Sequence, residues 1–123
     1  FTRSGTNWTV AANTSLPYQL RETSPSSGAA HYFLMDPAAA VVYIFKKPTG
    51  LLGWIADRHT NTLTYSYAPS GSFPTNIADG LGRSLALTYD FSDDPRGHVA
   101  TIRDQAGRTV RMTYGLVGTN IMP

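Results

Sequence analysis

Two stretches of the chain follow the same pattern of residues. Ile77 to Tyr89 and Ile102 to Tyr114 each place Asp two positions after Ile, Gly three positions after Asp, and Tyr ten positions after Asp. A third, weaker copy runs from Ile55 to Tyr67 and keeps the same separation between its Asp57 and its Tyr. The aspartates are 79 − 57 = 22 and 104 − 79 = 25 residues apart. Similar copies at such short intervals indicate a repeat protein, in which each copy forms one supersecondary unit.

Each copy is predicted to contain a tight turn. Asp and Gly at the first and fourth positions are the preference of a type I turn, and they occur as Asp79 with Gly82 and as Asp104 with Gly107. In the first copy Thr60 replaces the Gly and Asn61 replaces the Arg that follows it. Asn is the next-best residue after Gly for a positive φ, so we expect this turn to survive, shifted by one residue. The turns are therefore predicted at residues 57–61, 79–82 and 104–107.

The residues after each turn alternate in polarity. The positions six, eight and ten after the Asp are apolar or aromatic in every copy: Leu63, Tyr65 and Tyr67; Leu85, Leu87 and Tyr89; Val110, Met112 and Tyr114. Thr, Ser, Ala and Arg lie between them. A period of two predicts a strand with one buried and one solvent-facing side. With the Ile-bearing stretch as its other strand, each copy is predicted to be a β-hairpin.

The polar residues of the pattern are interpreted as structural. Asp57, Asp79 and Asp104 are expected to accept hydrogen bonds from the amides of their turns. Arg83 and Arg108 are expected to pair with the Asp of a neighbouring repeat. Such an exposed pair contributes about 0–1 kcal/mol.

Residues 1–47 are predicted to form degenerate hairpins that precede the repeats. Alternation around Trp8 and Val10, and again around Tyr18 and Leu20, predicts a first hairpin. A second is predicted from residues at the repeat's own offsets from Asp36, namely Leu34, Val42 and Ile44, with Lys46 where the Tyr would stand. Its turn contains Ala38, Ala39 and Ala40 instead of Gly, which leaves a helical turn as the alternative.

Pro and Gly mark the connections between hairpins, at residues 48–50, 68–71 and 93–97. Pro74 lies inside a predicted strand and has no amide to donate, so we expect a bulge there or an amide position that faces away from a partner. Residues 115–123 have no clear period and are expected to be a frayed tail. The fold class predicted is all-β, with one antiparallel meander of about ten strands. A sheet of that length is expected to twist and curl.

The repeat resembles the YD repeat of the Rhs family. The resemblance is carried by Ile77-Ala-Asp-Gly-Leu-Gly-Arg-Ser-Leu-Ala-Leu-Thr-Tyr-Asp90 and continues through the copies in residues 48–114. Trp8-Thr-Val, Leu16 to Glu22, and Asp36-Pro37 before Val42 to Phe45 are similar to the segment that precedes such repeats. The resemblance implies a curled piece of a larger β-shell that encloses a polypeptide, often a C-terminal toxin, in secreted bacterial effectors. It also implies a location outside the cell or on its surface, and related repeats in teneurins serve adhesion.

Composition excludes several other classes of function. The net charge is +2, and Lys46-Lys47 is the one basic doublet, so nucleic-acid binding is not supported. The chain has no Cys, and the spacings of His31, His59 and His98 match no metal site, so neither a metal nor another cofactor is expected. Gly80-Leu81-Gly82 lacks the third glycine of a dinucleotide fingerprint. The longest apolar run, Ala38 to Phe45, is too short to span a bilayer.

No arrangement of residues predicts an enzyme. Asp94-Pro95-Arg96-Gly97 is similar to the Asp-Pro-x-Gly autoproteolysis motif of the Rhs family, but His98 follows where Leu is expected and another repeat comes after it. A type I turn is the preferred interpretation. Trp8 and Trp54 are candidates for stacking on a carbohydrate or contacting a surface protein, with a place in the core as the competing interpretation.

The chain begins at Phe1, part-way into a pattern, and we expect it to be a segment of a longer polypeptide whose remaining repeats are its natural partners. Alone, its unpaired edge strands and uncovered apolar face predict association into a homodimer or higher oligomer.

Overall fold

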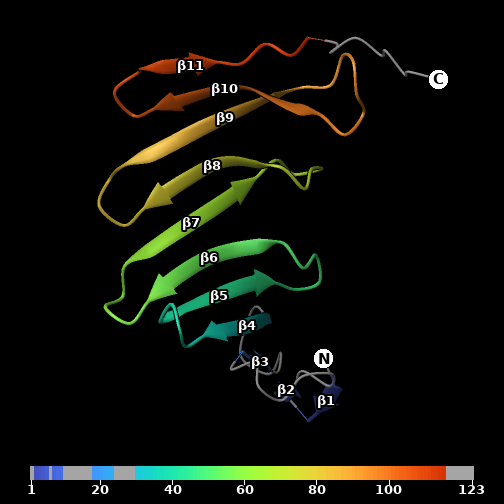
Figure 1. Ribbon diagram of the computed structural model, residues 1–123, viewed down its shortest axis with the longest axis vertical. Coiled ribbons are helices and arrows are strands. Elements are labelled where there is room, and N and C mark those ends of the chain that lie inside the picture. The colour runs from blue at the N-terminus through green and yellow to red at the C-terminus, as the bar shows by residue number, and fades with distance from the viewer. Residues whose placement is uncertain (1, 6, 10–17, 24–29, 116–123) are drawn as a thin grey trace, which may run out of the picture.

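The structure is a computed structural model that describes residues 2–5, 7–9, 18–23 and 30–115. These residues form a single antiparallel sheet of eleven strands, whose spatial order is their order in the chain (Figure 1). The strands are β1 (Thr2–Ser4), β2 (Asn7–Thr9), β3 (Gln19–Glu22), β4 (His31–Asp36), β5 (Val41–Lys46), β6 (Leu52–Asp57), β7 (Thr62–Tyr67), β8 (Pro74–Asp79), β9 (Ser84–Asp90), β10 (His98–Asp104) and β11 (Thr109–Arg111). The described residues contain no helix.

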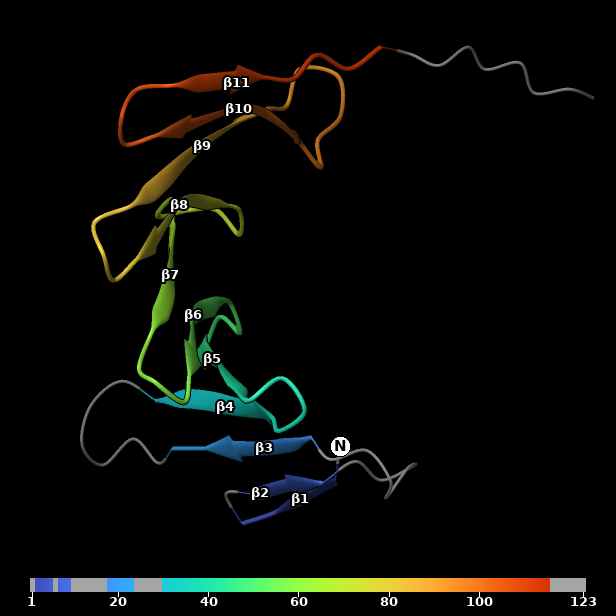
Figure 2. The ribbon, with the colours of Figure 1, turned by 60° about the vertical axis from the view of Figure 1, so that its left-hand side comes forward.

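The predicted all-β meander is therefore confirmed, with strand β1 as an addition. β1 pairs with β2, and β2 pairs with β3 as the predicted first hairpin requires. The outermost strands, β1 and β11, have one neighbour each, so the sheet is open. The strands rotate along it: β4 crosses the view of Figure 2 while β7 runs nearly upright. This twist is expected of strands built from L-residues. The predicted tail lies outside the described residues from 116 onward.

The register defines two faces of the sheet. The repeat face carries the predicted apolar positions of the hairpins, as the pairs Ile55 with Leu63, Tyr65 with Ile77, Ile77 with Leu85 and Leu87 with Ile102 show. The opposite face is polar between β7 and β11, where Thr64 pairs with Ala78 and Thr88 with Thr101. Between β4 and β6 it is apolar, because Phe33, Ile44 and Trp54 lie side by side across three strands.

Burial is lower than the alternation predicts. Among the described apolar residues only Ile44 is buried, with 2% of its surface exposed. On the repeat face Leu63 is 42%, Leu85 43% and Val110 61% exposed. The alternation assigned these side chains to the correct common face, but the prediction that this face is buried is wrong. Neighbours within one sheet cover only the flanks of a side chain, and the described residues supply no second layer over it.

The second predicted hairpin forms, but its offsets are wrong by one residue. Four residues, 37–40, separate Asp36 from its partner Val41, and Ala40 takes a positive φ of 54°. The longer turn moves Tyr43 opposite Leu34, so Val42 and Ile44 project from the opposite face. It also places Lys47, not Lys46, at the position equivalent to the repeat Tyr. The alternative of a helical turn is not adopted, because the segment closes a hairpin.

A bulge occurs at the same place in three strands. The pairing register shifts at Gly53 in β6, at Thr75 in β8 and at Ala100 in β10, each four residues before the Asp that ends its strand. Pro74 immediately precedes one of these bulges, which confirms the prediction made for it. A bulge increases the local twist and frees backbone groups from the ladder.

Candidate functional site

The repeat turn is organised by one carboxylate. In the second copy, Asp79 Oδ1 accepts hydrogen bonds from the amides of Leu81 and Arg83, both at 3.0 Å. The amide of Asp79 donates to the carbonyl of Arg83, also at 3.0 Å. A short acidic side chain can reach amides two and four residues ahead only at the start of a tight loop. The carboxylate of one residue therefore binds two of the backbone amides of the turn.

The other two copies repeat these contacts. Asp104 Oδ1 accepts from the amides of Ala106 at 3.0 Å and Arg108 at 2.9 Å. Asp57 Oδ1 accepts from the amides of His59 at 2.8 Å and Asn61 at 3.0 Å. The predicted role of the three aspartates, accepting amides within their turns, matches this geometry.

The residue four positions after each Asp binds the other carboxylate oxygen. Arg83 Nε donates to Asp79 Oδ2, and Arg108 Nε to Asp104 Oδ2, at 2.6 Å in both cases. In the first copy Asn61 Nδ2 makes the equivalent bond to Asp57 Oδ2 at 2.8 Å. The prediction that the arginines pair with a neighbouring repeat is wrong. The hairpin places the fourth residue across the loop from its own Asp, within the reach of one side chain.

The left-handed residue occupies one position in all three turns. Gly82 has a φ of +84° and Gly107 of +87°, as predicted, and Thr60 has a φ of +65°. The amide of Thr60 donates to the carbonyl of Asp57 at 3.2 Å, as that of Gly107 does to Asp104 at 3.0 Å. The predicted shift of the first turn to Asn61 is therefore wrong. The Asp contacts fix the loop length, and Thr60 must accept a conformation that L-residues with a branched Cβ rarely adopt.

These contacts lower the pKa of each turn carboxyl. For Asp57 the largest cause is the hydrogen bond from the Asn61 side chain, and for Asp79 it is the bond from the Arg83 amide. For Asp104 desolvation is the largest effect and raises the pKa, but the hydrogen bonds from Arg108 and Ala106 together with the charge of Arg108 outweigh it, and the net shift is downward. All three are thus held as carboxylates over the neutral range, which suits acceptors rather than acid or base catalysts.

The Tyr of each copy closes the far end of its hairpin. Its hydroxyl donates to the carbonyl of a residue fifteen positions earlier: Tyr67 to Leu52 at 2.7 Å, Tyr89 to Pro74 at 2.8 Å, and Tyr114 to Val99 at 3.0 Å. The acceptor always immediately precedes the bulged residue. Burial raises the pKa of Tyr67 and of Tyr89. We call the Asp contacts and the Tyr contact together the repeat ties.

Alternation alone did not predict the role of the tyrosine hydroxyl. The three tyrosines were identified as repeat positions, but only as members of an apolar face. A constant spacing of ten residues between Asp and Tyr was the available signal. An apolar side chain remains on the same face after a register shift of two residues. A hydroxyl that must reach one particular carbonyl requires a fixed register.

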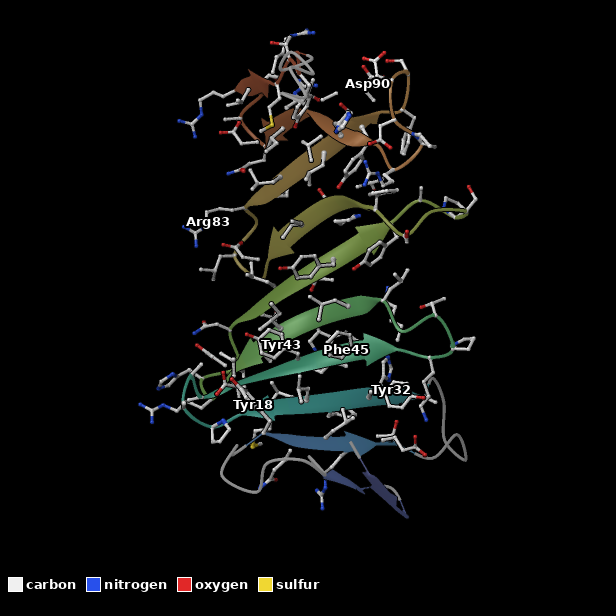
Figure 3. All side chains as sticks on the ribbon, turned by 45° about the vertical axis from the view of Figure 1, so that its right-hand side comes forward. Tyr18, Tyr32, Tyr43, Phe45, Arg83 and Asp90 are labelled. Carbon is white, nitrogen blue, oxygen red and sulfur yellow. The ribbon has the colours of Figure 1, made fainter. Side chains whose placement is uncertain are left out.

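The candidate stacking residues are not brought together as a site. Trp54 lies on the opposite face, half-buried, with the ring of His31 packed edge-on at 5.0 Å. Trp8 lies in β2 opposite Leu20, and its side chain is outside the described part of the structure. Labelled aromatic residues of β4 and β5 appear in Figure 3: Tyr32, Tyr43 and Phe45 belong to the repeat face.

The segment at Asp94 is a turn. The Gly97 amide donates to the Asp94 carbonyl at 2.8 Å, and Gly97 has a φ of +75°. Arg96 binds the Asp94 carboxylate through Nη2 at 2.8 Å. The ring of Phe91 lies so close that a Cβ on Gly97 would overlap it. Within the described residues no group of three metal-binding side chains gathers here or elsewhere.

Comparisons with known proteins add no identification. No family model, no curated protein and no solved structure matches the chain. Over the described residues, no helix has the length and apolar character needed to cross a membrane.

Proposed function

We propose that this chain is a non-catalytic structural segment of an Rhs/YD-repeat protein. In this proposal its hairpins form part of the wall of a shell that encloses a polypeptide, such as the C-terminal toxin of a secreted bacterial effector. The observation that carries the proposal is the recurrence of the repeat ties at three consecutive hairpins. The Asp and the Tyr that carry the resemblance in sequence are the residues whose side chains bind the two ends of each hairpin.

The chemistry of these groups favours a structural role over catalysis. Each turn carboxylate accepts hydrogen bonds from two amides and one side chain, so both of its oxygens already have donors. Each tyrosine hydroxyl donates to a backbone carbonyl. A catalytic acid or base needs an accessible proton or lone pair next to a substrate. In the repeat ties the carboxylates accept hydrogen bonds from backbone amides and the hydroxyls donate to backbone carbonyls.

The shape of the sheet supports a wall. It is one layer thick in the described residues, twisted, and open at both edges, so further hairpins can extend it. Between β7 and β11 one face is apolar and the other polar, as a wall with different surroundings on its two sides requires. The secreted or cell-surface location follows from the resemblance and belongs to the proposal.

Electron microscopy of the natural polypeptide that carries this chain tests the proposal. We expect a hollow particle whose wall contains these strands, and an enclosed segment that resists protease until the particle is denatured. A solid domain, or a downstream segment digested as fast as a free peptide, would contradict the proposal.

The alternative is an adhesion module that binds carbohydrate or protein through its exposed aromatic residues. Glycan-array binding by the chain, lost in Trp54→Ala while the circular dichroism spectrum is retained, would favour it. Unchanged binding in Trp54→Ala would remove Trp54 from that alternative.

A further inference from the structure

The outer edge of β11 has backbone groups that pair with no described strand. The Met112 amide donates to the Ala100 carbonyl at 2.9 Å, and the Asp104 amide donates to the Arg108 carbonyl at 3.0 Å. Antiparallel strands alternate between residues that bond inward and residues that bond outward. Thr109, Arg111 and Thr113 therefore direct their amides and carbonyls away from β10, where the described part of the chain places no strand.

The two preceding repeats show what occupies the equivalent edge. β8 covers β7 and β10 covers β9 in one shared register, with a bulge at the same position. The residue six positions after one Asp pairs with the Asp of the next repeat, as Leu63 pairs with Asp79 and Leu85 with Asp104. The Tyr pairs with the residue five positions before that next Asp, as Tyr67 pairs with Pro74 and Tyr89 with Val99. β11 has the same residue spacing as β7 and β9.

Exposure agrees with the lack of such a neighbour for β11 among the described residues. Val110 is 61% exposed, whereas Leu85 at the equivalent position of β9 is 43% exposed. Tyr114 is 55% exposed, whereas Tyr89 is half-buried. A neighbouring strand beside β9 explains why the equivalent side chains of β9 are less exposed than those of β11.

We propose that Arg111 selects the strand of the repeat's own type that pairs with the β11 edge. The strand ends in Asp, has an aliphatic residue two positions before the Asp and bulges four positions before it. Arg111 selects against a basic residue immediately before that Asp. The inference rests on the proposed function, since it names the kind of segment that continues the sheet.

The selectivity follows from the register. The residue seven positions after the Asp lies opposite the residue that immediately precedes the next Asp. Thr64 lies opposite Ala78 in this way, and Ala86 lies opposite Arg103. Arg111 occupies this position in β11, and it forms no ion pair with any described residue. A strand like β8 would place Ala opposite Arg111, whereas one like β10 would place Arg there. Like charges directly opposite each other destabilise a strand pair.

The other edge of a second copy is a poorer occupant. β1 spans Thr2–Ser4, and Ser4 pairs with Asn7 around a turn at Gly5 that contains no Asp. It therefore lacks the spacing that the β7 and β9 edges accept. The proposed partner is a repeat strand rather than the β1 edge of a second molecule.

Titration of the isotope-labelled full chain with a synthetic hairpin peptide tests the inference. The peptide has the sequence of residues 72–90, and amide spectra report which residues it contacts. We expect the amides of Thr109, Arg111 and Thr113 to shift and to exchange more slowly with solvent, while Val110 and Met112 keep their exchange rates. The peptide carrying Ala78→Arg should bind about two- to fivefold more weakly.

Charge reversal sharpens the test. In a chain carrying Arg111→Glu the Ala78→Arg peptide should become the tighter binder, and in Arg111→Ala the two peptides should bind equally. The side chain is exposed, so both variants are expected to fold. Equal affinities throughout, no response at the three outward amides, or a response at β1 instead would overturn the inference. A hollow particle seen together with any of those results would support the proposed function and contradict only the inference about β11. The expected peptide selectivity without a hollow particle would support the inference and contradict the proposed function.

Discussion

Large apolar side chains occupy both faces of the sheet in β4 to β6, but only one face in β7 to β11. The first region contains the single buried apolar residue of the described chain, Ile44, flanked across the strands by Phe33 and Trp54. The second region has no buried apolar residue, yet it carries the three complete sets of repeat ties, since β6 supplies the first Asp. One region is held by packing, whereas in the other fixed polar contacts set the register of a thin sheet.

The difference shows how a single layer can be specified without a core. Backbone ladders alone permit slippage, because a shift of two residues keeps the same face. The Asp and Tyr contacts remove that freedom, since each side chain reaches one set of backbone atoms. In the β4–β5 hairpin the ties are incomplete: the amides of Ala38 and Ala39 donate to Asp36, and Lys47 stands in place of the Tyr. There Lys47 forms an ion pair with Glu22 at 3.1 Å.

Truncation of Ile44 should give the largest loss of stability. Ile44→Ala removes a buried side chain, 2% exposed, and leaves a cavity, which typically costs about 2–5 kcal/mol. The matched change Leu85→Ala, at a site 43% exposed, should cost about 1 kcal/mol. Urea denaturation followed by circular dichroism measures both. Equal losses would show that the two regions are held in the same way.

Acid should weaken the repeat region next, because three sites act together. The pKa of each turn carboxyl in the folded state lies below the ordinary value of 3.8, so the folded chain binds protons less readily than the unfolded chain. The resulting stabilisation is present above about pH 4 and is lost as the pH falls through the folded-state values. Urea midpoints measured from pH 7 downward should show the decline, and Asp79→Asn should make it shallower. A midpoint independent of pH below 4 would contradict the role of the carboxylates.

Loss of a single tyrosine hydroxyl should have a smaller effect. Tyr89→Phe keeps the ring but leaves the Pro74 carbonyl without its donor, which costs about 0.5–1.5 kcal/mol. Tyr114→Phe should cost less, because this tyrosine is 55% exposed and water can replace its hydroxyl. Thermal denaturation ranks the two variants. A reversed order would mean that the far end of the last hairpin is held more firmly than its exposure suggests.

Much of the repeat region was predictable from its residues. Alternation assigned the apolar residues of each hairpin to a common face, and Asp with Gly three positions later placed two turns. Ala40 misled the prediction for β4 and β5, because Ala gives no signal for a positive φ and so hid the extra residue in that turn. The Arg–Asp pairing within one turn depends on three-dimensional proximity across the loop. Burial was overestimated because alternation reports which side chains share a face, not whether a second layer covers them.

The smallest expected effect is at Thr60, where the degenerate copy keeps the turn at the cost of strain. A β-branched residue at a φ of +65° is disfavoured by about 1–2 kcal/mol. Thr60→Gly relieves that strain but adds about 0.5–1 kcal/mol of unfolded-state freedom. It also removes the hydrogen bond from Thr60 Oγ1 to the His59 carbonyl. The net change should therefore be a stabilisation of about 0.5 kcal/mol.

Gly82→Ala is the matched control for Thr60→Gly. It introduces a Cβ at a φ of +84°, where no other atom lies within 4 Å, so the backbone alone determines its cost. It should destabilise the chain by about 1 kcal/mol. If Thr60→Gly stabilises the chain and Gly82→Ala destabilises it, Thr60 is strained in its turn. The Asp57 contacts, rather than the residue at position 60, would then be what fixes the geometry of the first turn. Destabilisation by both would mean that the Thr60 hydroxyl contributes more than the strain costs, and the first turn would then be an adapted variant rather than a strained copy.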